Sequence, residues 1–435
     1  MTELTPYFGQ GESDAELAGR TFSQVALGMT SSRILVIAYA VKARIASGAD
    51  VANFTVGDFA PGQFQIPARL NEEIQAALRT GQTNYPPANG TPELRTALQA
   101  HYRERLGLDY PLTSFVVASG ARPVLYAAYR CLVDPGEVVV TPAPSWNNNN
   151  FCHLVGARHV VVATRPEDAF MPTADRLRPH LSAARLLVLC SPMNPAGTMM
   201  TRSQMAEICE LIVDENRRRR TEGRRALYLI YDQVYWMLAF GDHAHVTPPQ
   251  IDPEMAAYTI MTDAVSKCFA GTGLRVGWAV SPPHIADKIK SLMTHMGAWA
   301  PRPEQIGTAA FLANQSDVNA FLNQFKAGIQ ARLDCLFEAF QAWHAEGLPI
   351  EVIPPQGAIY LSVKLDLIGR PGYPDEDAVR VALLEQAGCA IVPFSAFGDH
   401  HNAGWVRFSV GAVSLDDIRA CLPRIKAMLM EAQRD

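Results

Sequence analysis

Residues 266–278 read Ser266-Lys267-Cys268-Phe269-Ala270-Gly271-Thr272-Gly273-Leu274-Arg275-Val276-Gly277-Trp278. In this stretch a lysine between small residues is followed eight positions later by an arginine in a glycine-rich turn. The lysine amine can form a Schiff base with an aldehyde, and the planar guanidinium can bind a phosphate on the same molecule. Most lysines are solvated surface residues, so this stretch alone is weak evidence for a site, and the motifs described below strengthen it. It indicates a site for a phosphorylated aldehyde.

Composition limits the classes of protein to which the chain can belong. The 435 residues are 48% hydrophobic, which is enough for a large core and favours two unequal domains. A formal net charge of -5 argues against a nucleic-acid binder. Eight cysteines stand singly without a CxxC pair, which predicts reduced intracellular thiols and no metal site. Residues 1–20 lack the apolar core of a signal peptide, and no apolar run approaches the roughly 20 residues that span a bilayer. We expect a soluble, cytoplasmic enzyme.

Strand-like and helix-like runs alternate from about residue 65 to 320, which predicts an α/β domain with helical crossovers. The sequence predicts strands at 115–118, 137–141, 159–163, 186–190, 227–231, 359–363, 390–392 and 405–410, and helices at 31–47, 124–132, 318–344 and 415–431. We predict an N-terminal arm with part of a small domain (1–64), a large cofactor-binding domain (65–320) and a small C-terminal domain (321–435). The smaller α+β domain is therefore built from both chain termini.

An arginine run at residues 217–220, followed by Arg224 and Arg225, is the one basic cluster in the chain that suggests nucleic acid. The surrounding domain carries no net positive charge to support that interpretation. We interpret the run as a solvated helix end.

Two motifs follow buried strands at the edge where open α/β sheets bind ligands. The first, residues 191–198, contains two prolines and a glycine that force an irregular turn and aim Asn194 into the crevice as a hydrogen-bond donor. The second places Asp232 at the end of another strand, with Tyr235 three residues later. A buried carboxylate needs a cation or strong donors, and a protonated pyridine nitrogen is one such partner. Tyr235 could then reach a phenolic oxygen of the same ring. An ordinary strand–helix turn at Asn194 and a capping aspartate at 232 are the alternatives.

Three further motifs point to the same kind of ligand. Gly120, Ala121 and Arg122 lie between a strand and a helix, where exposed backbone N–H groups form an anion site. Trp146 follows the next strand and could stack on a heteroaromatic ring, although a core tryptophan is the alternative. Arg407 lies inside an alternating apolar strand, where its fork matches a carboxylate bidentately unless it forms a structural salt bridge.

Together these motifs resemble the aspartate aminotransferase superfamily, the class I/II aminotransferases of pyridoxal-phosphate fold type I. The resemblance runs in the family's order and approximate spacing from residues 53–58 to the strand of Arg407, and it includes Asn84 with Tyr85 and the segment 90–95. It implies a mostly parallel sheet of the seven-stranded type flanked by helices, with pyridoxal 5'-phosphate as cofactor.

The resemblance also implies a role for each residue. Lys267 holds the cofactor and shuttles a proton, Asp232 keeps the pyridine nitrogen protonated, and Asn194 and Tyr235 bind the phenolic oxygen. Trp146 stacks on the ring, while the phosphate is held by Arg275, Ser266 and the backbone of Gly120, Ala121 and Arg122. Arg407 binds the α-carboxylate, with Gly57, Asn194 and Trp146 lining the substrate pocket. Tyr85 reaches the phosphate in the neighbouring subunit, which implies a homodimer.

The chain departs from the family pattern at three places. Ala264 stands where a phosphate-binding hydroxyl is frequent, so Ser266 is expected to contribute more. Phe394 replaces a frequent glycine and suggests a reshaped substrate pocket. Residues 147–150 are four asparagines where an aromatic residue is frequent, and they either bind substrate or form a solvated turn.

We expect transfer of an amino group from an L-amino acid to a 2-oxo acid. Arg122 could contact a distal carboxylate, which predicts an aspartate- or glutamate-like donor. If Arg122 faces solvent, the pocket is instead apolar or aromatic and lined by Tyr360, Phe394 and Phe397. Another pyridoxal-phosphate activity, as a lyase, decarboxylase or oxidase, remains the alternative, and a regulatory sensor domain is a second one. No nucleic acid and no membrane are expected as partners.

Overall fold

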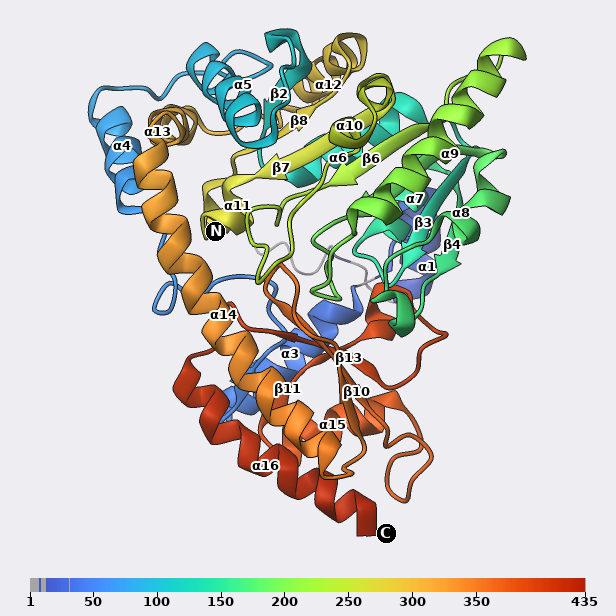
Figure 1. Ribbon diagram of the computed structural model, residues 1–435, viewed down its shortest axis with the longest axis vertical. Helices are drawn as coiled ribbons and strands as arrows, with labels where there is room; N and C mark the ends of the chain where they lie inside the picture. The colour runs from blue at the N-terminus through green and yellow to red at the C-terminus, as the bar shows by residue number, and fades with distance from the viewer. Residues whose placement is uncertain (1–7, 9–12, 31, 435) are drawn as a thin grey trace.

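The computed structural model describes residue 8 and residues 13–30 and 32–434. Its larger part contains a central sheet covered by helices, and its smaller part contains a second sheet beside two long helices (Figure 1). Within the described residues, no helix combines the length and the apolar character needed to cross a membrane.

The central sheet has seven strands in the order β2-β8-β7-β6-β5-β3-β4. These are β2 (Phe115–Ala118), β3 (Val138–Ala143), β4 (Arg158–Ala163), β5 (Ala184–Cys190), β6 (Tyr228–Asp232), β7 (Thr259–Ala264) and β8 (Gly277–Val280). All neighbouring pairs are parallel except those of β8, which runs antiparallel to both β2 and β7. The predicted α/β class with a mostly parallel seven-stranded sheet is confirmed.

Helices cover both faces of the central sheet because its strands are apolar on both sides. Val188 and Ile230 pack on one face with residues of α6, α7 and α12, whereas Leu187 and Leu229 pack on the other face with α8 and α9. The helices of this part are α4 (Ala68–Arg79), α5 (Pro92–Leu106), α6 (Ala121–Leu132), α7 (Asn148–Val155), α8 (Ala174–Leu181), α9 (Arg202–Thr221), α12 (Pro283–Met296) and α13 (Arg302–Leu312), with two single turns, α10 (Pro248–Ile251) and α11 (Val265–Cys268). The result is a three-layer domain with all its parallel strands ending at one edge.

The smaller part joins segments from both ends of the chain. Its antiparallel sheet has the order β12-β13-β10-β9, and a separate parallel pair joins β1 to β11. The strands are β1 (Ala52–Asn53), β9 (Ile350–Val352), β10 (Tyr360–Leu365), β11 (Cys389–Ala390), β12 (Val392–Pro393) and β13 (Trp405–Ser409), and the helices are α3 (Arg33–Ala46), α14 (Gln315–Ala345), α15 (Glu376–Gln386) and α16 (Leu415–Arg434). A small domain from both termini is confirmed, while the boundaries at 64/65 and 320/321 stay a prediction.

Several element boundaries differ from the sequence expectation by one to three residues, and two of the differences are explained by local contacts. Helix α14 begins at Gln315, before residue 318, because Asn314 caps it by accepting the backbone N–H of Asp317. The single strand expected at 390–392 is instead two short strands, β11 and β12, which pair with different neighbours. Helix α14 runs along the molecule from the large part to the small part (Figure 1).

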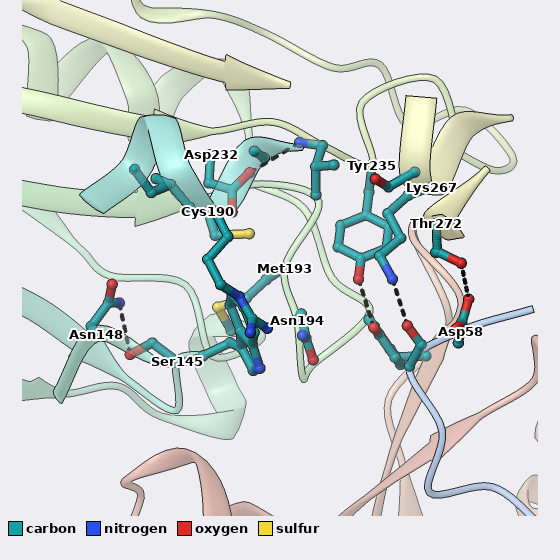
Figure 2. A pocket seen from close by; sticks show the side chains of 18 of the residues that line it. Asp58, Ser145, Asn148, Cys190, Met193, Asn194, Asp232, Tyr235, Lys267 and Thr272 are labelled. Carbon is teal, nitrogen blue, oxygen red and sulfur yellow. Dashed lines mark hydrogen bonds between the residues drawn. The ribbon is translucent and has the colours of Figure 1, made fainter. Parts of the chain in front are cut away.

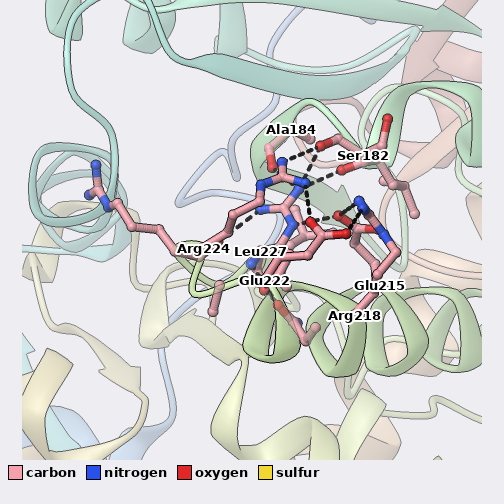
Figure 3. Close-up of polar contacts among 12 residues, drawn as sticks. Ser182, Ala184, Glu215, Arg218, Glu222, Arg224 and Leu227 are labelled. Atoms are coloured by element: carbon pink, nitrogen blue, oxygen red, sulfur yellow. Dashed lines mark hydrogen bonds and ion pairs between the residues drawn. The ribbon is translucent and has the colours of Figure 1, made fainter.

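The arginine run at the end of α9 is only partly solvated. Arg217 and Arg218 are exposed as predicted, but Arg219 is 3% exposed, so the prediction is wrong for that residue. Its guanidinium donates to the carbonyls of Leu181 and Ala184, both at 2.7 Å, and pairs with Glu215 (Figure 3). These carbonyls lie where α8 ends and β5 begins, so Arg219 joins α9 to that connection.

Candidate active site

A cavity of about 790 Å³ lies at the carboxyl ends of the parallel strands. Most of the predicted site residues line it: Gly57, Ala121, Arg122, Trp146, Asn194, Asp232, Tyr235, Ser266, Lys267, Arg275 and Arg407. Gly57 and Arg407 lie toward the small domain and the others belong to the large one. The fold therefore brings together residues from segments more than 300 positions apart in the sequence, from Gly57 to Arg407.

Lys267 lies on α11 (Val265–Cys268), a single turn that follows β7 directly. Its Nζ donates to the carbonyl of Gly57 at 2.5 Å and lies 6.0 Å from the ring centroid of Tyr235 (Figure 2). Burial lowers the pKa of Lys267 to about 8, against the opposing effect of Asp58. A half-buried amine with a lowered pKa is neutral more often near pH 7 and can act as a nucleophile.

Asp232 ends β6 and points into the same space as Lys267 (Figure 2). Its Oδ1 accepts the backbone N–H of Val234 at 3.2 Å, which is the local turn contact that the capping alternative predicts. Burial raises the pKa of Asp232 to about 6, and among the described residues no cation forms an ion pair with it. A half-buried carboxyl in this state suits a ligand that brings its own positive charge.

The predicted anion site is formed by Gly120 and Arg275. Gly120 has φ 87° and precedes α6 without a side-chain cap, so the first N–H groups of α6 remain available to an anion. Arg275 donates to the carbonyls of Thr272 at 2.7 Å and Ser119 at 3.0 Å. A Cβ on Gly120 would lie 2.1 Å from Nη2 of Arg275, so glycine is required for the arginine to lie there. Gly120 itself does not line the cavity, but it leaves space for Arg275, which does.

Two hydroxyl groups lie close to this anion site. Ser266 is buried and lines the cavity, while Ala264 ends β7 without a hydroxyl. Thr272, which the sequence interpretation did not single out, also lines the cavity, and its hydroxyl donates to Asp58 at 2.6 Å.

Arg122 and Trp146 form one wall of the cavity. The guanidinium carbon of Arg122 lies 4.7 Å from the ring centroid of Trp146, a cation–π arrangement. Burial, and then the charge of Arg275, lower the pKa of Arg122. Arg122 lines the cavity but is also exposed to solvent, so it combines features of the two orientations considered from the sequence.

Phe394 does not line this cavity. It is fully buried and packs edge-on against Phe170, with ring centroids 4.9 Å apart. The expectation that Phe394 reshapes the pocket directly is wrong, because the side chain points into the core beneath β13. Tyr360 does line the cavity.

Arg407 lies on β13 and is 2% exposed. It donates to Oδ1 of Asn194 at 3.0 Å and to the carbonyl of Thr55 at 2.6 Å, and its Nε is buried without a partner. Its guanidinium lies between the rings of Tyr360 and Phe397, at 4.7 and 4.8 Å. Among the described residues Arg407 forms no salt bridge, so the structural alternative is not supported and the side chain is available to an anion.

Tyr235 and Gly57 both lie next to the hydroxyl group of Tyr360. The hydroxyl groups of Tyr235 and Tyr360 lie 2.6 Å apart, and a Cβ on Gly57 would lie 2.9 Å from the Tyr360 hydroxyl. Burial raises the pKa of Tyr235 well above its usual value. The sequence interpretation considered Tyr360 only as an apolar wall, because the pairing of β10 with β13 that places it beside Arg407 cannot be read from the residues.

Three of the four asparagines have contacts that bear on the two roles considered for them, and both roles stay predictions. Asn148 lines the cavity and is held by Tyr129, whose hydroxyl donates to it at 3.0 Å, and by Ser145 at 3.2 Å (Figure 2). Asn150 donates to Asn147 at 3.1 Å, so these two form a local turn ahead of and within α7.

Tyr85 lies outside the cavity of its own chain. It is 81% exposed, and its ring meets Trp299 edge-on with centroids 5.2 Å apart. An exposed tyrosine of this kind is available for contact with a second molecule.

Comparison with known proteins identifies the family. Residues 49–425 match the family "Aminotransferase class I and II". The chain is 29% identical over 407 residues to the aspartate/prephenate aminotransferase of Thermus thermophilus, covering 92% of this chain and 97% of that protein. It is 28% identical to the aspartate aminotransferase of Geobacillus stearothermophilus, covering 93% and 98%. The solved structure of the Thermus thermophilus aspartate aminotransferase with maleate has a TM-score of 0.84 at 27% identity, covering 94% of this chain and 100% of that one. The chain belongs to the class I and II aminotransferases, enzymes that use pyridoxal phosphate.

Proposed function

We propose that this aminotransferase takes its amino group from an acidic L-amino acid, aspartate or glutamate, and transfers it to a 2-oxo acid. The observation that carries the proposal is a pair of arginines in one cavity. Arg407 is buried without a carboxylate partner, and Arg122 lines the same space. Two cations suit a donor with two carboxylates. The names of the relatives, aspartate and aspartate/prephenate aminotransferases, support the same substrate class.

Pyridoxal phosphate, when bound, supplies the electron-accepting ring and carries the amino group between the two substrates. We propose that Lys267 holds it covalently and then, once released, moves the proton at the substrate Cα. The lowered pKa of Lys267 supports both tasks, because a neutral amine is needed for each. Asp232 would keep the pyridine nitrogen protonated, and the ring cation would in turn pair with this half-buried carboxyl.

The remaining residues orient the cofactor and the substrate. Trp146 would stack on the ring, while Asn194 and Tyr235 would donate to its phenolic oxygen. The N–H groups of Ala121 and Arg122 beyond Gly120, with Ser266 and Arg275, would hold the phosphate. Gly57 and Asn194 would line the pocket in which Arg407 binds the α-carboxylate.

We also propose a homodimer in the cytoplasm. Tyr85 is exposed on its own chain and would reach the phosphate site of the partner subunit. All eight cysteines are free thiols, which suits a reducing compartment.

The test is the visible absorption spectrum of the holoenzyme while amino acids are added one at a time without an oxo acid. We expect aspartate or glutamate, at low concentration, to abolish the visible band and to release one equivalent of the matching 2-oxo acid. If aromatic or aliphatic amino acids do so and acidic ones do not, the acidic-donor proposal is wrong. Release of ammonia, carbon dioxide or peroxide instead would assign the chain to a lyase, decarboxylase or oxidase activity.

A further inference from the structure

A buried carboxyl, Asp263, lies behind the cavity and takes no part in lining it. It belongs to β7 and is 1% exposed. Its Oδ2 accepts the indole N–H of Trp236 at 2.8 Å, and its Oδ1 accepts the backbone N–H of Ala264 at 2.7 Å. Each oxygen of this carboxyl therefore has its own donor.

The Trp236 contact joins the two segments that carry the proposed chemistry, whereas the Ala264 contact lies within one of them, because Ala264 is the next residue after Asp263. Trp236 follows Tyr235 directly in the turn after β6, and Ala264 is the last residue of β7 before the single turn that carries Lys267. We propose that Asp263 is a positioning residue that fixes the Tyr235 turn to the Lys267 segment. The proposal rests on the roles proposed above for Tyr235 and Lys267.

The same turn is held at its other end by Tyr102. Gln233, which follows Asp232, donates to the Tyr102 hydroxyl at 3.2 Å, and Trp278 of β8 donates to it at 3.1 Å. Tyr102 is fully buried on α5, and its hydrogen bond to Asp263 opposes the effect of burial, which raises the pKa of Asp263 well above its usual value. A buried network whose donors and acceptors are paired is rigid, so the turn has little freedom to move.

The chemistry of the side chain explains why a carboxyl is placed there. An apolar residue of similar size would avoid the cost of burying a polar group. Only a carboxyl offers two acceptor oxygens on one short side chain, and asparagine offers a single one. The substitution Asp263→Asn therefore removes one of the two acceptor oxygens, leaves the N–H groups of Trp236 and Ala264 to compete for the other, and keeps the volume almost unchanged. Trp236→Phe removes the indole donor from the other side of the same link.

The test compares holoenzyme variants by the pH midpoint of the visible absorption of the bound cofactor. A hydroxyl that donates to the phenolic oxygen favours the deprotonated state of the bound cofactor and so lowers the pH midpoint. The substitution Tyr235→Phe should therefore raise the pH midpoint. We expect Asp263→Asn and Trp236→Phe to raise it in the same direction, by about 0.5–1 pH unit, the equivalent of one hydrogen bond. The double variant Tyr235→Phe/Asp263→Asn should shift no further than Tyr235→Phe alone, because both changes remove one interaction.

The matched control is Met261→Ala, two residues earlier on β7 and fully buried in the core. It creates a cavity in the same core cluster and lowers the Tm without removing a hydrogen-bonding group of the Asp263 network. If the pH midpoint shifts as far in Met261→Ala as in Asp263→Asn, the role of Asp263 is merely structural and the proposal is overturned. Additive shifts in the double variant would overturn it as well.

Amide hydrogen exchange separates this proposal from the proposed function. In the protein without cofactor, Asp263→Asn should accelerate exchange at least tenfold in residues 233–237 and in residues 264–268, whereas Met261→Ala should not produce this joint change. If Tyr235→Phe leaves the midpoint unmoved, the proposed role of Tyr235 is wrong, and the exchange result decides whether Asp263 links the two segments. Unchanged exchange in both segments would overturn the link itself.

Discussion

The guanidinium of Arg407 donates to the side-chain oxygen of Asn194 across 3.0 Å. A residue of the small domain thus sets the orientation of an amide that follows a strand of the large domain. Because Oδ1 of Asn194 is occupied by this bond, the amide nitrogen is the group that it can offer as a donor elsewhere.

Arg407→Ala should lower kcat/KM for an amino-acid donor by about 100-fold or more, since it removes a buried, charge-assisted contact to the α-carboxylate. Steady-state kinetics with the donor panel would measure the loss. Arg407→Lys should recover only part of the activity, because an ammonium group cannot reproduce the planar fork. Equal kcat/KM values in the wild type and Arg407→Ala would contradict the assignment.

Lys267 should react as an amine with a pKa of about 8 in the protein without cofactor. Acylation of Lys267, followed by peptide mass spectrometry, should increase as pH rises through about 8, because the amine loses its proton there. Lys42, an exposed lysine of α3, provides a comparison in the same sample. Borohydride reduction should attach the cofactor to Lys267, and Lys267→Ala should leave no attached cofactor.

Asp232→Asn should have opposite effects on stability and on cofactor binding. The pKa of Asp232 is raised above its unfolded value, so between about pH 4 and 6 the folded state binds more protons than the unfolded state and stability falls as pH rises. Above pH 6, removing this carboxyl should stabilise the protein without cofactor by on the order of 2–3 kcal/mol. Urea unfolding at pH 4 and pH 7 would measure this difference. The same variant should bind pyridoxal phosphate at least 10-fold more weakly, and tighter binding would refute the proposed pairing with the ring nitrogen.

Gly120→Ala should weaken cofactor binding because its Cβ would displace Arg275. We expect the Kd for pyridoxal phosphate to rise about 10-fold or more, the equivalent of losing one charge-assisted hydrogen bond. Gly136→Ala is the control, because Gly136 has φ 85° but its added Cβ would meet nothing within 4 Å. Both variants carry the backbone strain of a positive φ, so a similar Kd in the two would mean that strain alone is responsible.

Arg122→Ala should raise the KM for aspartate and glutamate about 10-fold and leave that for apolar donors almost unchanged. Arg130→Ala, an exposed arginine at the other end of α6, serves as the control for a lost surface charge. An unchanged KM for both acidic donors in Arg122→Ala would remove the basis of the acidic-donor proposal.

The sequence predicted those parts of the fold that depend on local patterns. Apolar runs predicted five of the seven strands of the central sheet, but not β7 and β8. Residues at or just after the ends of these strands, such as Asp232 and Asn194, lie in one cavity because parallel strands end at one edge. The stretch around Lys267 and Arg275 was interpreted from residue chemistry alone, and both side chains line that cavity.

Features that depend on tertiary pairing were not predicted. The position of Phe394 beside a site motif suggested that its side chain lines the pocket. Its ring packs against Phe170 in the core instead. Arg219 looked like its exposed neighbours in the run, yet the carbonyls it binds come from α8 and β5, far away in the sequence. Tyr360 acquires its place through the register of β10 with β13.

The parallel pair of β1 with β11 also has a consequence for the order of events during synthesis. Ala52 pairs with Cys389, so this strand pair can form only after nearly all of the chain has left the ribosome. Gly57, whose carbonyl accepts a hydrogen bond from the Lys267 amine, lies shortly after β1 in the sequence, and Arg407 lies after β11. The large domain can therefore acquire its sheet while translation continues, but the catalytic pocket is completed last.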